Sequence, residues 1–398
     1  MIIPKNKKIP KGFRFAVASA GIKHKGRADM GLIVSDVEAA AAGVFTTNRV
    51  RAFNIDLNKK KLRYGRGQAI VVNSGNANVC TGKQGEKDTI YMADSTAQLI
   101  GVAPGRTFVC STGVIGTPMP MDNVRKGINT LARDLGKHSI SDVSNAIMTT
   151  DRFPKTSSRQ IMVGGKMVTI TASAKGAGMI DPNMATMLCF IITDARIEGS
   201  AMKKVLKDVV NDTFNTITVD GDMSTSDTVL MMANGLAGNK IIKPGSKDIK
   251  KVKATVHDIC YELAEMMVKD GEGATKIIDI EVKGAKTKAD ARKAADAIAN
   301  SLLVKTAIYG NDANWGRIIA AAGYSGANFN HRKVSIFFNR LLAVKNGVSA
   351  TTDKAANAEL KKKKVKITID LNAGKCAAAA LSCDLTEEYI RINAGYRT

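Results

Sequence analysis

Short apolar runs alternate with amphipathic segments along almost the whole chain, and this alternation limits the folds that the chain can adopt. Residues 69–73, 108–110 and 187–192 each predict a short buried strand. The segments at about 84–101 and 200–214 predict helices instead. Because elements of both kinds alternate, the chain can be neither all-helical nor all-β. The sequence therefore predicts an α/β fold in which mixed sheets are layered with helices.

Further elements and a change of composition predict two domains. The remaining predicted elements are a hairpin at 161–163 and 167–170, a strand at 216–219, a helix around His257, a strand at 277–280, a helix at about 287–303, and strands near 334–338 and 364–371. A linker-like composition, with Pro244 and Gly245, occupies residues 239–245. Because 398 residues are enough for two or three domains, we predict a first α/β domain at 1–238 and a second at 239–398.

The chain is strongly basic, with 59 lysine and arginine residues against 36 acidic residues and a formal net charge of +23. Aromatic residues make up only 5%, and none is interleaved with the lysine clusters at 59–61 and 361–364. This pattern favours a solvated, lysine-rich surface over a platform for stacking bases. No apolar run reaches the ~18 residues that cross a bilayer, and Met1–Lys5 lacks the apolar core of a secretory signal. We therefore expect a cytoplasmic protein without a nucleic-acid or membrane partner.

The spacing of cysteine and histidine argues against a metal site. None of the six cysteines forms a CxxC pair, so we expect free thiols in a reducing compartment. The four histidines stand far apart, without a short ligand spacing, so the sequence predicts no zinc site. The glycine-containing stretch at 271–276 lacks the spacing of a phosphate-binding loop. We therefore expect neither a metal nor an organic cofactor.

The most unusual stretch runs from Lys175 to Leu188 and reads KGAGMIDPNMATML. Small and turn-forming residues lead directly into a strand pattern, with Thr186 at the junction. A hydroxyl in such a turn can attack the preceding carbonyl carbon, and water then cleaves the resulting ester between Ala185 and Thr186. The freed α-amine has an ordinary pKa of about 7.7–8, so it can act as the base for its own side-chain oxygen. Taken alone, the pattern also fits a threonine that simply begins a strand.

This stretch resembles the self-cleavage motif of the glutamate N-acetyltransferase (ornithine acetyltransferase) family of arginine biosynthesis. Further blocks resemble the family and follow its order over nearly the whole chain: NSGNAN at 73–78, STGVIG at 111–116, TTD at 149–151, FNTITVDGD at 214–222, DGEGATK at 270–276, GNDANWGR at 310–317 and INAGYRT at 392–398. The family commonly reads GDTSTND where this chain has Met223 and Ser226 within residues 221–227. Neither position is assigned to catalysis.

The resemblance implies a two-domain acetyltransferase of the N-terminal-nucleophile type, which processes itself and uses no cofactor. It implies that Thr186 carries acetyl from N2-acetyl-L-ornithine to L-glutamate in a ping-pong cycle, giving L-ornithine and N-acetyl-L-glutamate. Some family members also take acetyl from acetyl-CoA, and the resemblance leaves that donor open for this chain. It further implies that the fragments 1–185 and 186–398 stay together as a heterotetramer with two copies of each.

The resemblance also assigns roles to individual residues. Thr112 and Gly113 match the pair that stabilises the oxyanion of the tetrahedral intermediate. The positions that match substrate-binding residues are Thr149, Lys175, Thr186, Glu272, Asn393 and Thr398. Lys175 suits a substrate carboxylate, and Glu272 suits the side-chain ammonium of ornithine. A rival interpretation is a threonine N-terminal-nucleophile aminopeptidase or amidase, which would share the cleavage but pass the acyl group to water.

Overall fold

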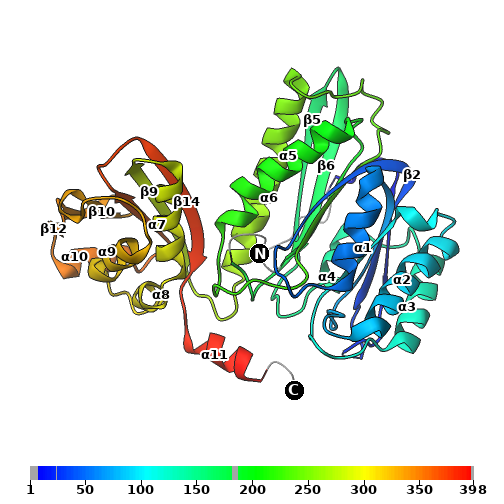
Figure 1. The fold of residues 1–398 in the computed structure, drawn as a ribbon, viewed down its shortest axis with the longest axis horizontal. Helices are drawn as coiled ribbons and strands as arrows, with labels where there is room; N and C mark the ends of the chain where they lie inside the picture. The colour runs from blue at the N-terminus through cyan, green and yellow to red at the C-terminus, as the bar shows by residue number, and fades with distance from the viewer. Residues whose placement is uncertain (1–7, 24, 182–186, 396–398) are drawn as a thin grey trace. The chain divides into compact units, whose positions relative to one another are not determined.

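The computed structural model describes residues 8–23, 25–181 and 187–395, and Figure 1 shows the fold. The chain divides into two compact units. Unit 1 comprises Met1–Gly176, Asn183–Asn215 and Met223–Ala264. Unit 2 comprises Ala177–Pro182, Thr216–Asp222 and Glu265–Thr398. Each unit is therefore assembled from segments that lie far apart in the sequence.

Among the described residues, unit 1 is built on an eight-stranded sheet. Its strands are β1 (Phe13–Ala18), β2 (Met30–Phe45), β3 (Arg66–Asn73), β4 (Thr107–Ser111), β5 (Lys155–Val163), β6 (Lys166–Lys175), β7 (Leu188–Thr193) and β8 (Thr228–Ala233). They lie in the order β4-β3-β2-β8-β7-β6-β5, and β1 pairs with β2. Strands β3 and β4 are parallel, as are β7 and β8, whereas β6 runs antiparallel to both β5 and β7.

The long strand β2 connects the two halves of this sheet. Its register against β3 shifts between Val34 and Ala39, and such an irregularity bends a strand. Beyond the shift, residues 40–45 pair with β8. Phe108 of β4 and Phe190 of β7 consequently belong to one buried apolar cluster, although their strands are far apart in the sheet order. The bend thus lets two parts of one sheet share a core.

Helices cover the remaining faces of unit 1. They are α1 (Phe53–Lys61), α2 (Gly82–Leu99), α3 (Met121–Arg133), α4 (Ile140–Ala146), α5 (Gly199–Asp212) and α6 (Lys247–Lys269), whose residues up to Ala264 belong to this unit. Helices α2 and α3 lie side by side (Figure 1) and pack Met92 and Ile128 against β1–β4. Lys253 of α6 forms an ion pair with Asp208 of α5 at 2.8 Å. The sheet is thereby shielded, and its central strands β7 and β8 read as nearly continuous apolar runs.

Unit 2 contains a second mixed sheet, six-stranded among the described residues. Its elements are β9 (Ile277–Ala285), α7 (Lys288–Asn300), α8 (Leu302–Tyr309), α9 (Trp315–Tyr324), β10 (Ser335–Phe338), β11 (Leu341–Lys345), β12 (Val348–Ser349), α10 (Asp353–Glu359), β13 (Lys364–Asp370), β14 (Cys376–Cys383) and α11 (Glu387–Ala394). Strand β9 lies between β13 and β14. Alanines of α7 and apolar residues of α8 and α9 form one core with this sheet.

These elements confirm the predicted α/β fold class, but the strand predicted at 216–219 is wrong. A 3-10 turn occupies Phe214–Thr216, and Ile217 makes only an isolated bridge to Leu381. The backbone N–H of Thr218 bonds to Leu381 and that of Val219 to Ile180, so no continuous ladder forms. The helix predicted at 287–303 is two helices, because the Ser301 side chain caps α8 at the N–H of Val304.

The segment at 239–245 is anchored within unit 1. The side chain of Asn239 accepts from the backbone N–H of Arg196 at 2.9 Å, and Ile242 pairs with Ile197. The compact units are interleaved in the sequence, whereas the predicted domains divide the chain once, between 238 and 239. The division into domains at 1–238 and 239–398 therefore stays a prediction. In the described part of the chain, every helix is too short or too polar to span a bilayer.

Candidate active site

The loop after β4 carries the predicted oxyanion pair and is held against the loop after β3. The N–H of Thr112 donates to the carbonyl of Asn73 at 3.1 Å, and the N–H of Val114 donates to that of Gly75 at 3.3 Å. Gly113 has φ +133, and a Cβ there would lie 2.3 Å from the carbonyl carbon of Gly75. Only glycine fits this close approach of two backbones. Within the described segments, no group accepts a hydrogen bond from the Gly113 N–H, so that donor remains available for an anion.

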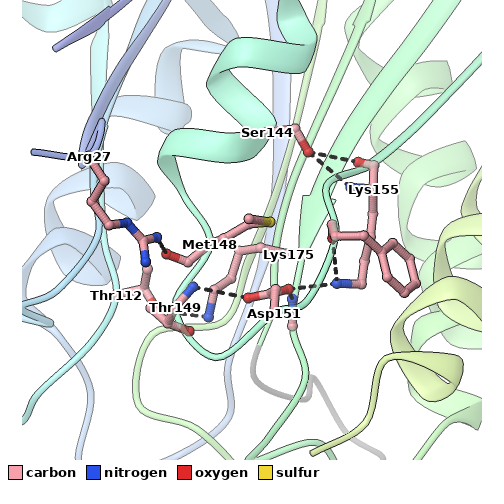
Figure 2. A network of polar contacts seen from close by, with 10 residues as sticks. Arg27, Thr112, Ser144, Met148, Thr149, Asp151, Lys155 and Lys175 are labelled. Carbon is pink, nitrogen blue, oxygen red and sulfur yellow. Dashed lines mark hydrogen bonds and ion pairs between the residues drawn. The ribbon is translucent and has the colours of Figure 1, made fainter. Parts of the chain in front are cut away.

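Lys175, the last residue of β6, reaches the same loop. Its side chain is buried, and its Nζ donates to Oγ1 of Thr112 at 3.2 Å (Figure 2). Because this hydroxyl accepts from an ammonium, its own proton is free to point elsewhere. Thr112, Gly113 and Lys175 therefore form a local cluster of donors with a positive charge beside it. Such a cluster suits a developing oxyanion or a carboxylate.

Asp151 organises the surroundings of Lys175 (Figure 2). Its Oδ1 accepts from Nζ of Lys155 at 2.7 Å and from the backbone N–H of Gly176 at 2.8 Å. Its Oδ2 accepts from the backbone N–H of Thr149 at 3.1 Å. One carboxylate thus holds the residue that follows Lys175 together with the predicted substrate-binding Thr149.

The Asp151 carboxylate is charged in spite of its burial. Burial by itself raises the pKa of this group, but the charges of Lys155 and Lys175, followed by the hydrogen bonds from Lys155 and Gly176, outweigh that effect and lower the pKa to about 2. The Asp151 and Lys155 side chains are both 0% exposed. A buried pair of this kind is costly to break, because the remaining charge has no partner.

The predicted cleavage site lies between two paired strands. Lys175 at the end of β6 is in register with Leu188 at the start of β7. Ala185 and Thr186 lie outside the described residues. The next residue, Met187, donates its backbone N–H to Oδ1 of Asp227 at 2.8 Å. The chain therefore leaves the sheet after Lys175 and returns directly beside it.

Unit 2 holds the predicted binding acid. Glu272 is 8% exposed and accepts at Oε2 from Nδ2 of Asn393 at 2.8 Å. Its backbone N–H donates to the carbonyl of Ala177 at 2.9 Å. A Cβ on Gly178 would lie 2.5 Å from the Glu272 carboxyl group, so the bare glycine leaves the space that this carboxyl occupies. Glu272 and Asn393 are thus brought together, whereas Thr398 lies outside the described residues.

The structure adds two buried carboxylates, Asp151 and Asp227, that the sequence did not single out. Both stand in blocks that resemble the family, at 149–151 and 221–227, but nothing in those blocks marks an acid as buried. Within residues 8–23, 25–181 and 187–395, no three His, Cys, Asp or Glu side chains are grouped to hold a metal ion. The described part of the site therefore consists of backbone N–H donors, threonine hydroxyls, and lysine, aspartate and glutamate side chains.

Comparison with known proteins decides the family. A model of the ArgJ family matches residues 14–398. The chain belongs to the ArgJ family. The arginine biosynthesis bifunctional protein ArgJ of Geobacter sulfurreducens is 47% identical to this chain over 98% of the chain and 99% of that protein. The protein of the same name from Symbiobacterium thermophilum is 48% identical over 98% of each.

A solved structure agrees with the ArgJ assignment. The crystal structure of the arginine biosynthesis bifunctional protein ArgJ from Bacillus halodurans, at 2.00 Å resolution, is 44% identical with a TM-score of 0.51. The match covers 52% of this chain and 98% of that one. The resemblance read from the sequence blocks is therefore confirmed. So is the prediction that this ArgJ-family chain is an acyltransferase enzyme of arginine biosynthesis.

Replacement of Asp151 by asparagine should destabilise unit 1. The variant leaves the buried Lys155 ammonium without its carboxylate, which costs about 3–5 kcal/mol of unfolding free energy. In the wild type, the lowered pKa of Asp151 stabilises the fold above pH ~4, and this contribution disappears as the pH falls towards about 2. Asp151→Asn should lose that part of the pH dependence.

Chemical unfolding between pH 7 and pH 2 measures both effects. Asp36→Asn is the matched control, because Asp36 forms an ion pair with Arg14 in which both side chains are about half exposed. Such a pair contributes only about 0–1 kcal/mol. Equal losses in the two variants would contradict the role of Asp151.

Proposed function

We propose that this chain is a self-processing acetyltransferase that moves acetyl from N2-acetyl-L-ornithine to L-glutamate through an acetyl-Thr186 ester. The observation that carries the proposal is the pairing of Lys175 with Leu188, next to the contact between Lys175 and Thr112. Thr186 is two residues before Leu188, and two residues span at most about 7 Å. This short span supports the assignment of Thr112 and Gly113 as the oxyanion donors for a nucleophile that precedes β7.

Each half of the cycle uses the same groups. Oγ of Thr186 attacks the acetyl carbonyl carbon while the α-amine of Thr186 takes the hydroxyl proton. The oxyanion of the tetrahedral intermediate receives hydrogen bonds from the Thr112 hydroxyl and the Gly113 N–H. The amine of ornithine then leaves with that proton. In the second half of the cycle, the α-amine of glutamate attacks the carbonyl carbon of the Thr186 ester, and the same steps in reverse release N-acetyl-L-glutamate. No further reactant is needed.

The strand pairing also supports the self-cleavage. Residues 176–187 connect two neighbouring antiparallel strands whose ends are paired at Lys175 and Leu188. A cut after Ala185 leaves those strand hydrogen bonds in place. The match to the solved Bacillus halodurans chain covers 98% of that chain but only 52% of this one. That chain is therefore about as long as one of the two proposed fragments. We further propose that the fragments 1–185 and 186–398 stay associated, two copies of each.

The predicted substrate-binding residues have local surroundings that suit charged groups. In unit 2, one carboxyl oxygen of Glu272 accepts from Asn393, and the other makes no hydrogen bond to any described residue. That oxygen suits the side-chain ammonium of ornithine. In unit 1, Lys175 and Thr149 suit the carboxylate shared by both amino acids. Thr398 remains part of the proposal by resemblance alone.

Mass measurement tests the processing step. The purified protein should give two masses, for fragments 1–185 and 186–398, and Thr186→Ser should do the same because it keeps a hydroxyl. Thr186→Ala should remain one chain and release no ornithine. An active protein that consists only of intact chains would rule out processing as a requirement.

The same samples separate acetyl transfer from hydrolysis. Ornithine release from N2-acetylornithine should require glutamate. Acetyl-CoA supplied in place of N2-acetylornithine shows whether it is a second acetyl donor. Release at the same rate without glutamate would favour the threonine aminopeptidase or amidase.

Replacement of Thr112 by valine should lower kcat by about 10²–10³, because one oxyanion donor is lost. Thr112→Ser, which keeps the hydroxyl, is the matched control and should stay near the wild-type rate. The measurement is steady-state kinetics on fully cleaved protein. Equal rates for the valine and serine variants would remove Thr112 from the oxyanion site.

Replacement of Glu272 by glutamine should reduce kcat/KM for N2-acetylornithine by about 30-fold or more, because a buried charge partner of the substrate is lost. The KM for glutamate should change much less, since glutamate carries no side-chain ammonium. Glu388→Gln is the control, because Glu388 is a half-exposed acid on α11, the helix that carries Asn393. Unchanged kcat/KM for N2-acetylornithine in Glu272→Gln would contradict the binding role.

A further inference from the structure

Two segments of unit 2 contact Glu272, the proposed binding acid for ornithine. The first is the turn at 177–180: the carbonyl of Ala177 accepts from the backbone N–H of Glu272 at 2.9 Å, and the carboxyl group of Glu272 fills the space beside Gly178. The second is α11, from which Nδ2 of Asn393 donates to Oε2 of Glu272 at 2.8 Å. Both segments belong to the same compact unit as Glu272. The position of this carboxyl group therefore depends on what fixes the turn and the helix.

Asp220 holds the turn at 177–180. Its Oδ2 accepts from the backbone N–H of Met179 at 2.7 Å, and its Oδ1 accepts from that of Ile180 at 2.8 Å. Met179 has φ +50, a conformation that residues with a side chain adopt only rarely. Two successive N–H groups thus converge on one carboxyl group, and these bonds stabilise the turn that contacts Glu272.

The same carboxyl group reaches α11. None of the eight residues of this helix is buried, so apolar packing contributes little to its position. The hydroxyl of Tyr389 donates to Oδ2 of Asp220 at 3.3 Å. Nδ2 of Asn393 donates to the backbone carbonyl of Tyr389 at 3.0 Å as well as to Glu272. The residue of α11 that contacts Glu272 is therefore bonded to the residue that contacts Asp220.

The charge states along this path suit the contacts. Burial raises the pKa of Asp220 to about 6, although three backbone N–H groups oppose the effect. Burial, followed by the charges of Asp220, Glu272 and Asp222, raises the pKa of Tyr389 well above its usual value. At pH ~8, Asp220 is therefore a charged acceptor, and Tyr389 keeps the proton that it donates.

We propose that Asp220 is a positioning residue for the ornithine-binding site: its carboxylate holds the turn at 177–180 and, through Tyr389, the helix that carries Asn393. A binding carboxylate that is already held in place loses less freedom when the ligand ammonium arrives, so it binds more tightly. This inference rests on the proposed function, in which Glu272 binds the side-chain ammonium of ornithine. Because glutamate has no such ammonium, Asp220 should affect the use of N2-acetylornithine and not that of glutamate.

Asp220→Asn tests the carboxylate. Asparagine keeps one acceptor oxygen but places an NH2 group opposite one of the two backbone N–H groups, so the turn loses a bond. We expect kcat/KM for N2-acetylornithine to fall about tenfold or more, while kcat and kcat/KM for glutamate stay within about threefold of the wild type. Loss of this kind in one half of a ping-pong cycle is not what general destabilisation produces.

Asp222→Asn is the matched control for Asp220→Asn. Asp222 is an exposed acid two residues away that contacts Asp220 through its backbone N–H at 3.3 Å, and the substitution preserves that contact. Its kcat/KM for N2-acetylornithine should stay within about threefold of the wild type. Equal values for the two variants would overturn the proposal.

Tyr389→Phe removes only the hydroxyl, and it decides the matter if Asp220→Asn fails to fold. Since the bond of 3.3 Å is longer than the usual ~2.8 Å, we expect kcat/KM for N2-acetylornithine to fall about fivefold, with kcat nearly unchanged. Tyr309→Phe is the control, because the Tyr309 hydroxyl bonds to Glu387 on the same helix and has no contact with Asp220 among the described residues. A loss as large in Tyr309→Phe as in Tyr389→Phe would overturn the path through Asp220.

Combination with Glu272→Gln shows whether Asp220 acts through Glu272. In that background, Asp220→Asn or Tyr389→Phe should lower kcat/KM for N2-acetylornithine by no more than about twofold further, because the group that they position is already altered. Losses that multiply in full would overturn the proposal. Failure of the proposed function gives a different result, because Glu272→Gln alone would then leave kcat/KM unchanged or ornithine release would not depend on glutamate.

Discussion

The antiparallel pairing of β6 with β7 is the constraint on which the rest of the site depends. It places Lys175 in register with Leu188, so the chain leaves the sheet after Lys175 and re-enters it beside that residue. Thr112 reaches that place because the bend in β2 lets β4 and β7 share a core. Unit 1 thereby brings Lys175 and the start of β7 together with the predicted oxyanion loop, which is more than 60 residues earlier in the sequence.

Two buried aspartates beside this pairing show how local donors decide the charge of an acid. Both Asp151 and Asp227 are removed from water, and burial by itself raises the pKa of each. Asp151 receives hydrogen bonds from Lys155, Gly176 and Thr149, and its pKa falls to about 2. Asp227 receives the backbone N–H of Met187, and burial outweighs this bond, the charge of Lys175 and the hydroxyls of Thr46 and Ser224, so its pKa stays raised. The local donors therefore favour the charged form of Asp151, whereas burial favours the neutral form of Asp227.

Much of the fold could be predicted from the sequence, because periodicity reports local structure well. The buried strand at 69–73 and the helix at about 84–101 are close to β3 and α2. The strand at 216–219 was wrong, because its backbone bonds to Ile180 and Leu381, partners that no local pattern reveals. Thr112 and Lys175 could be identified only by family resemblance. The roles of Asp151 and Asp227 depend on burial and on long-range contacts, so they emerge only in three dimensions.

The interleaving of the units bears on how two fragments could remain one protein. A cut after Ala185 assigns β6 to one fragment and β7 to the other, although they are hydrogen-bonded neighbours inside the sheet of unit 1. In unit 2, the first fragment would contribute residues 177–182, whose Ile180 carbonyl accepts from Val219 and Thr218 of the second. Separation would break a ladder within the sheet and expose apolar faces buried on both strands, which is the main source of stability in such a fold. The topology therefore supports the proposal that cleavage would create an amine without releasing a chain.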